Sequence, residues 1–166
     1  MHRVEVAPLD EGRKIVIVDM DGTVADAAHR LHHIQTRPKN WKAFFEGMDR
    51  DPLIPVVADW VRALAKDYQV VIVTGRPAEY ADRSAAWLRK HRIPFVQMFL
   101  RRSGDHRPDY VAKEDLLRVI PPERIAFAID DREPVCAMWK RNRVRCFLVS
   151  SGEENRVINE EYRKKA

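Results

Sequence analysis

The sequence lacks the cysteine pairs of disulfide-bonded or zinc-binding proteins and the long apolar runs of membrane proteins. Its only two cysteines, Cys136 and Cys146, are ten positions apart and form no CxxC pair. No apolar run approaches the ~18 residues of a membrane-spanning helix. The first residues include Glu5, Asp10 and Glu11 instead of an apolar signal core. These absences predict reduced thiols, a cytoplasmic location and no membrane partner.

Two further patterns are missing. No GxxxxGK(S/T) string occurs, which excludes 5′-phosphorylation by this chain through a phosphate-binding loop. His29, His32 and His33 stand at i, i+3 and i+4, but no cysteine lies near them. Because this spacing also describes one face of a short helix, we do not expect these histidines to bind zinc.

The composition fits one globular domain with a basic surface. Of the 166 residues, 45% are hydrophobic, which suffices for a substantial core. Lysine and arginine exceed aspartate and glutamate by 30 to 25, a net charge of +5 that favours a phosphorylated partner. We expect a single domain over residues 1–152 with a small cap insertion at about 24–55, followed by a charged tail over 153–166.

Apolar runs and helical spacing alternate along the chain. The runs predict strands at about 14–19, 69–73, 95–100, 124–129 and 144–149. The spacing between them predicts helices at about 55–67, 77–92, 109–120 and 132–142. Residues 1–13 read as a lead-in or an edge strand, and 40–46 as a short helix in the insertion. The order predicts an α/β fold, with a Rossmann-like parallel five-stranded sheet and helices on both faces.

Polar side chains follow three of these strands. Asp19 and Asp21 come after the first strand, Thr74 after the second, and Asp130 and Asp131 after the fourth. The carboxyl ends of parallel strands meet at one edge of a sheet, so four carboxylates would converge there. They would repel one another unless a cation lies between them, and oxygen ligands without histidine or cysteine favour Mg²⁺. We therefore expect a magnesium ion at the four aspartates, and with it a phosphorylated substrate.

The same residues suit phosphoryl transfer. Asp19, fixed at a strand end, is placed to attack phosphorus and form an aspartyl-phosphate. Asp21 has a charged neighbour that favours its protonated form, so it can protonate the leaving oxygen and then activate water. Thr74 and Lys113 can hold the phosphate oxygens and neutralise developing charge.

These positions resemble the four motifs of the haloacid dehalogenase (HAD) superfamily. The motifs occur in order as Asp19-Met20-Asp21-Gly22-Thr23, Thr74, Lys113 and Asp130-Asp131. The second acid at Asp21 argues against the dehalogenase branch and favours phosphoryl transfer. The resemblance implies the HAD fold and a magnesium-dependent phosphatase.

A closer resemblance covers residues 14–152. It rests on the strings SGDHR at 103–107, DYVAKE at 109–114, AIDDR at 128–132 and MWKR at 138–141, which are similar to the phosphatase domain of bacteriophage polynucleotide kinase-phosphatases. That family removes 3′-phosphates from nucleic-acid ends and nucleotides. The resemblance therefore implies phosphorylated nucleic-acid ends or nucleotides as partners, together with a possible separate kinase or ligase.

The resemblance also implies residue roles. Asp19 is the nucleophile and Asp21 the general acid-base, while Thr74 and Lys113 support the chemistry. The positions that match the family's further activity residues are Arg30, Arg76 and Asp109, which we expect to bind substrate. Asp130 and Asp131 match its metal-side acids.

Other functions and roles fit the same sequence. A 5′-nucleotidase or a general small-phosphoester phosphatase would use the same motifs, and a longer cap than that of the phage domain would shift preference towards mononucleotides. A non-catalytic module that binds nucleic-acid ends is a third reading. Trp41, Phe44 and Phe45 either stack on a base or form the core of the cap. The arginines at positions 101, 102 and 107 either bind flanking phosphates or keep a turn soluble.

Overall fold

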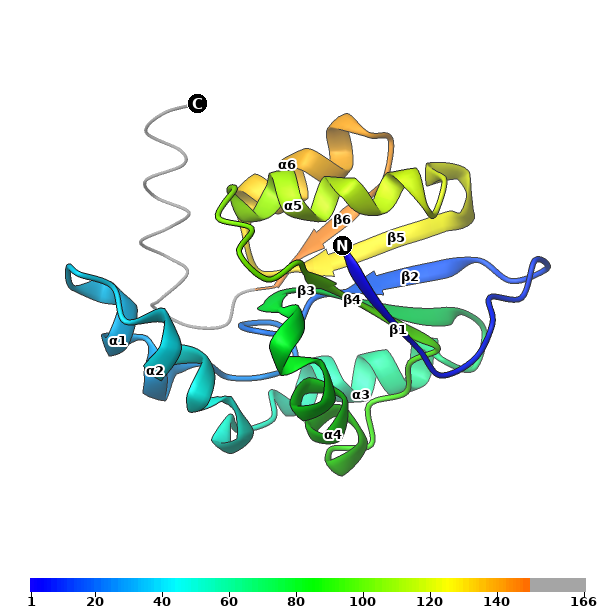
Figure 1. Cartoon of the computed structure of the whole chain (residues 1–166). Coiled ribbons are helices and arrows are strands. Elements are labelled where there is room, and N and C mark those ends of the chain that lie inside the picture. The colour runs from blue at the N-terminus through cyan, green and yellow to red at the C-terminus, as the bar shows by residue number, and fades with distance from the viewer. Residues whose placement is uncertain (150–166) are drawn as a thin grey trace.

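A six-stranded sheet organises the computed structural model, which describes residues 1–149 (Figure 1). The strand order is β1-β4-β3-β2-β5-β6, and only the β1–β4 pair is antiparallel. The strands are β1 His2–Glu5, β2 Ile15–Val18, β3 Gln69–Pro77, β4 Gln97–Arg101, β5 Ile125–Asp130 and β6 Cys146–Leu148. The predicted α/β class is confirmed, and β1 adds an antiparallel edge to the five parallel strands. The tail predicted at 153–166 lies outside the described residues.

Helices cover both faces of the sheet, as predicted (Figure 1). One face carries α3 Pro55–Leu64 and α4 Ala81–Lys90. The other carries α6 Glu133–Arg141 and α5 Asp109–Glu114, which continues into the 3-10 turn η4 Asp115–Arg118. A further 3-10 turn, η5 Pro122–Arg124, leads into β5.

The central strand β2 is buried on both faces. Val16 and Val18 pack into the core under α3 and α4, whereas Ile15 and Ile17 pack into the core under α5 and α6. All four side chains are at most 2% exposed. This alternation explains why the strand reads as an unbroken apolar run, and it fixes the position of the chain immediately after Val18.

The start of α4 differs from the prediction that Pro77 opens a helix. Pro77 is extended, with φ −64° and ψ 153°, and pairs with Arg101 of β4 after a register shift that begins at Thr74. The 3-10 turn η3 Ala78–Tyr80 follows, and α4 begins at Ala81. The prediction was wrong because β4 offers Pro77 a strand partner, which the local sequence does not reveal.

The segment between β2 and α3 forms four short helical elements. They are η1 Ala28–Arg30, α1 His32–Gln35, α2 Trp41–Glu46 and η2 Met48–Arg50. Asn40 caps α2, because its side-chain oxygen accepts a hydrogen bond from the Ala43 N–H at 3.0 Å. Figure 1 shows α1 and α2 beyond the carboxyl ends of β2 and β5. We call residues 24–55 the cap segment.

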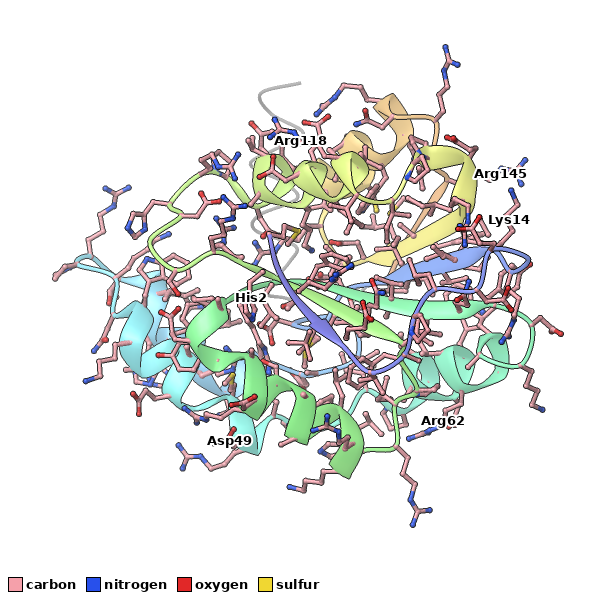
Figure 2. The ribbon with its side chains drawn as sticks, turned by 45° about the vertical axis from the view of Figure 1, so that its right-hand side comes forward. His2, Lys14, Asp49, Arg62, Arg118 and Arg145 are labelled. Carbon is pink, nitrogen blue, oxygen red and sulfur yellow. The ribbon has the colours of Figure 1, made fainter. Side chains whose placement is uncertain are left out.

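The basic residues are spread around the surface. Figure 2 shows Arg62, Arg118 and Arg145 at the periphery on different sides of the molecule. No helix within residues 1–149 is both long and apolar enough to cross a bilayer. Cys136 is buried, Cys146 is half-buried, and both are free thiols.

A core truncation on α4 should destabilise the fold. Leu88 is 0% exposed within the core under α3 and α4. We expect Leu88→Ala to lower the free energy of unfolding by about 2–5 kcal/mol, because a cavity replaces the lost side chain. Urea denaturation measures the change. Val56→Ala, at a helical position that is 75% exposed, is the matched control and should leave stability nearly unchanged.

Candidate active site

Three buried acids meet where β2 and β5 end. Asp19 directly follows β2, Asp130 is the last residue of its neighbour β5, and Asp131 follows it. Their exposed fractions are 5%, 2% and 1%. Each offers a carboxylate oxygen, and the three oxygens lie within 4.8 Å of one another. Within residues 1–149 this is the one such group suited to a metal ion, and the carboxylate of Asp21 is not part of it.

Lys113 on α5 places one positive charge against these acids. Its Nζ lies 2.8 Å from Asp19 Oδ1, 2.8 Å from Asp130 Oδ2 and 3.3 Å from Asp109 Oδ2. Burial alone would lower the pKa of Lys113, but the three carboxylates raise it well above its usual value. Lys113 is therefore charged and orients Asp19.

One ammonium does not neutralise the acids. Burial raises the pKa of Asp19, and it raises that of Asp130 to about 7, although Lys113 opposes both shifts. Burial also raises the pKa of Asp131 well above its usual value, and the charges of Asp19 and Asp130 add to the effect. A divalent cation would stabilise the ionised forms, and a set of hard oxygen donors fits Mg²⁺.

Asp21 lies beside the acids but belongs to a different network. Arg76 donates to both of its carboxylate oxygens, through Nε at 3.0 and 3.1 Å and through a terminal nitrogen at 2.5 Å. Arg30 donates to Asp21 Oδ1 at 2.6 Å. Burial would raise the pKa of Asp21, but the two guanidinium groups outweigh it and hold the pKa below its usual range. The expectation that a charged neighbour favours the protonated form was wrong, because the two arginines lie in direct contact.

The same arginines hold a second acid, Asp51, that the sequence analysis missed. Arg30 donates to its two carboxylate oxygens at 2.7 and 2.6 Å, and Arg76 donates to Oδ2 at 2.8 Å. Asp51 is 2% exposed and also contacts His29 Nε2 at 2.9 Å. Its sequence context, Asp-Arg-Asp-Pro, reads as an exposed turn. No local signal predicts its burial.

Arg30 and Arg76 are themselves 0% exposed and do not line the cavity of the site. They join the cap segment, which supplies Arg30 and Asp51, to the sheet edge, which supplies Arg76 and Asp21. Direct substrate binding by the two arginines stays a prediction. The contacts instead show them orienting the Asp21 carboxylate.

Asp109 is held close to β3. Arg101 donates to its Oδ1 at 2.9 Å, and a Cβ added at Gly75 would lie only 2.7 Å from the same oxygen. Glycine is therefore required for this approach. Burial would raise the pKa of Asp109, but Lys113, Arg132 and Arg101 together lower it. Asp109 lines the cavity, and its contact with a substrate stays a prediction.

Two threonines of the motifs are fully buried. Thr74 is 0% exposed, and its hydroxyl oxygen accepts a hydrogen bond from the Arg76 N–H at 3.2 Å. It does not line the cavity, so its contact with phosphate stays a prediction. Thr23, to which no role was assigned, donates to Asp131 Oδ1 at 3.3 Å and to Asp19 Oδ2 at 3.4 Å. Its place in the first motif was the available signal.

A cavity of about 690 Å³ opens above these residues. Asp19 and Asp21 line it together with Asp109 and Arg132. Its walls come from the cap segment on one side and from the loop between β4 and α5 on the other. The first motif thus faces an opening large enough for a small ligand.

The family follows from a comparison with known proteins. The model of the polynucleotide kinase PNKP phosphatase domain matches residues 13–153. The chain belongs to this family. The PNKP phosphatase family lies within the HAD superfamily, so both resemblances stated from the motifs are confirmed.

Individual relatives agree with the assignment. A chain in the structure of the Pnkp1/Rnl/Hen1 RNA repair complex is 28% identical with a TM-score of 0.67, and the match covers 86% of this chain and 44% of that one. A probable C-terminal domain small phosphatase of Dictyostelium discoideum is 27% identical over 124 residues, which are 70% of this chain and 38% of the relative. The chain therefore spans less than half of each relative.

A more distant structure supports the fold alone. A haloacid dehalogenase-like hydrolase from Streptococcus pneumoniae has a TM-score of 0.59 at 14% identity, and the match covers 90% of both chains.

Asp51→Asn should destabilise the protein strongly. The change leaves Arg30 and Arg76 buried with only Asp21 to balance them, and breaking a buried ion pair from one side costs about 3–5 kcal/mol. Urea unfolding measures the loss. The control is Asp59→Asn, which removes an exposed partner of Arg62 and should have little effect. Equal stability of the two variants would contradict the network's importance.

Asp131→Asn should weaken Mg²⁺ binding at least about tenfold, or about 1.4 kcal/mol, because it removes one of the three clustered carboxylates. Isothermal titration calorimetry measures the affinity without any substrate. Asp49→Asn, which changes an exposed ion pair with Arg83, is the control with the same charge change. Unchanged affinity in Asp131→Asn would place the ion elsewhere.

Proposed function

We propose that this PNKP phosphatase family member is a magnesium-dependent phosphomonoesterase that removes 3′-phosphates from polynucleotide ends or nucleotides through an aspartyl-phosphate. One observation carries the proposal. Asp19 faces the cavity while Lys113 holds its Oδ1 at 2.8 Å, with the three-acid group beside it. A nucleophile, a fixed cation and a metal site thus meet at one point.

In the first half-reaction, a carboxylate oxygen of Asp19 forms a bond to phosphorus while the bond from phosphorus to the sugar 3′ oxygen breaks. A proton moves from Asp21 to that oxygen, so the nucleic acid leaves with a 3′-hydroxyl. In the second, water attacks phosphorus, the bond to Asp19 breaks and Asp21 accepts the proton of the water. Phosphate is released, and both aspartates regain their starting states.

Asp21 must carry a proton in the first step, although its arginine partners lower its pKa. A phosphate group in the cavity brings negative charge next to Asp21, which opposes the arginines and raises that pKa towards the range of an acid. Once the product has left, the arginines favour the carboxylate that activates water. Mg²⁺, when bound, supplies positive charge to the phosphate oxygens.

The 3′ preference rests on the family and on the strings in the sequence that resemble the phage phosphatase domain. A 5′-nucleotidase of the same superfamily would use the same acids and differ only in how it holds the sugar. A possible separate kinase or ligase that acts on the same ends stays part of the proposal, because this chain supplies only phosphatase motifs.

The substrate panel is the decisive test. Purified protein with Mg²⁺ should release phosphate from a 3′-phosphorylated oligonucleotide faster than from a 5′-phosphorylated one or from 5′-mononucleotides. Malachite green detection of phosphate measures each rate. Equal or faster turnover of 5′-mononucleotides would favour the 5′-nucleotidase. Binding of oligonucleotides with no release from any ester would favour a non-catalytic module.

Substitution of the two acids of the first motif should impair different steps of the reaction. Asp19→Asn removes the nucleophile and should abolish phosphate release. Asp21→Asn should slow turnover of oligonucleotides by about 10²–10⁴. With radiolabelled p-nitrophenyl phosphate, whose leaving group needs no proton, Asp21→Asn should accumulate labelled protein that acid quenching preserves. Asp82→Asn, exposed on α4, is the control. An Asp19→Asn protein as active as its parent would disprove the covalent route.

A further inference from the structure

One wall of the cavity is aromatic. Trp41 and Phe45 of α2 stack with ring centroids 5.9 Å apart and planes at 21°, and Phe45 lies 5.4 Å from Tyr80 of η3. All three residues line the cavity. We call Trp41, Phe45 and Tyr80 the aromatic wall.

The wall rests on the core of the cap segment. Phe44 belongs to that core and also borders the cavity: it is 5% exposed, the Arg30 guanidinium lies 4.2 Å from its ring centroid, and its ring meets those of Trp41 and Phe45 edge-on. Trp41, three positions earlier, is 48% exposed. Lys39 lies over the Trp41 ring at 5.5 Å, but Lys39 lines a second hollow and not the cavity. Trp41 itself lines both hollows, so part of its exposed ring borders the cavity.

Two cations border the same cavity without a partner of their own. Lys42 of α2 and Arg102 of the β4–α5 loop are exposed, and neither forms a side-chain hydrogen bond or ion pair with any residue in 1–149. The neighbouring Arg101 and Arg107 are engaged by Asp109 and by Asp105 and Asp115 respectively. Phosphate binding was one of two interpretations of these three arginines, and among them Arg102 alone has no carboxylate partner within residues 1–149.

The aromatic wall and the two rim cations together suit one kind of ligand. A phosphorylated sugar would leave the aromatic wall without a contact, whereas an unpaired base stacks on such rings whatever its identity. The cavity volume of about 690 Å³ falls within the ~300–1,000 Å³ of ordinary ligand sites, which admits a nucleoside above Asp19. The unpaired cations at the rim can bind a second phosphate besides the 3′-phosphate. A 3′-mononucleotide carries no second phosphate, whereas a polynucleotide does.

We propose that this cavity binds the terminal nucleoside of a single-stranded polynucleotide 3′ end. The base stacks on the aromatic wall, and Lys42 and Arg102 bind the phosphodiester immediately 5′ of that nucleoside. The inference rests on the proposed 3′-phosphatase function and refines its substrate. An oligonucleotide gains both contacts, so it is preferred over a mononucleotide.

Trp41→Ala tests the stacking contact. For a 3′-phosphorylated oligonucleotide the variant should raise KM about tenfold with little change in kcat, because a base loses its platform. The same oligonucleotide with an abasic terminal residue, and p-nitrophenyl phosphate, should be hydrolysed as by the parent. Trp41→Phe, which keeps a ring, should behave nearly as the parent. An equal effect on base-bearing and abasic ends would overturn the stacking site.

Lys42→Ala and Arg102→Ala test the phosphodiester contact. Each should raise KM several-fold for the oligonucleotide at low salt and lose that effect at high salt, while leaving the 3′-mononucleotide unchanged. Arg145→Ala is the control, because this exposed arginine lies at the end of the molecule away from the cap segment (Figure 2). Equal effects of the rim variants on mononucleotide and oligonucleotide would contradict the proposal.

A binding measurement separates this proposal from the phosphatase assignment. Fluorescence anisotropy of a labelled 3′-phosphorylated oligonucleotide with the Asp19→Asn protein needs no turnover. Weaker binding on adding Trp41→Ala or Arg102→Ala supports the subsite even if the parent hydrolyses no ester, an outcome that would reject only the phosphatase assignment. Unchanged binding in both double variants overturns the subsite even if hydrolysis is observed.

Discussion

The need to balance buried charge governs this molecule. A sheet that ends in Asp19, Asp130 and Asp131 gathers negative charge where almost no water reaches it. Lys113 supplies one fixed positive charge, and the remaining excess is what suits the group to a divalent cation. The feature that would destabilise an ordinary core is thus the feature that prepares the site for a phosphate.

A second group of buried charges lies beside the first, and it consists of different residues. Asp21 and Asp51 form ion pairs with Arg30 and Arg76, so the two negative and two positive charges balance without a metal. Asp19 and Asp21 are only two positions apart, yet one belongs to the group with surplus negative charge and the other to the neutral network. Their contrasting pKa shifts follow from this division, and the proposed roles of nucleophile and proton carrier use it.

The features that could be predicted from the sequence are those set by a local pattern of residues. Strands such as β2 are contiguous apolar runs because both faces are buried, and the motif acids follow them directly, so the three-acid group with Lys113 could be anticipated. Asp51 could not, because its burial depends on arginines 21 and 25 positions away. The low pKa of Asp21 was missed for the same reason. β1 was only one of two readings, since its side chains are mostly exposed at the edge.

The arginine network also makes the cap segment an unusual kind of insertion. Arg30 and Asp51 stand near its two ends, and each contacts a group that the sheet fixes. A cap exchanged between relatives would therefore have to bring its own arginine and aspartate, or the Asp21–Arg76 pair of the sheet edge would lose its two partners in the cap. In such proteins the aromatic and basic surface residues of the cap can vary while its two ends stay tied to the sheet edge through the arginine network.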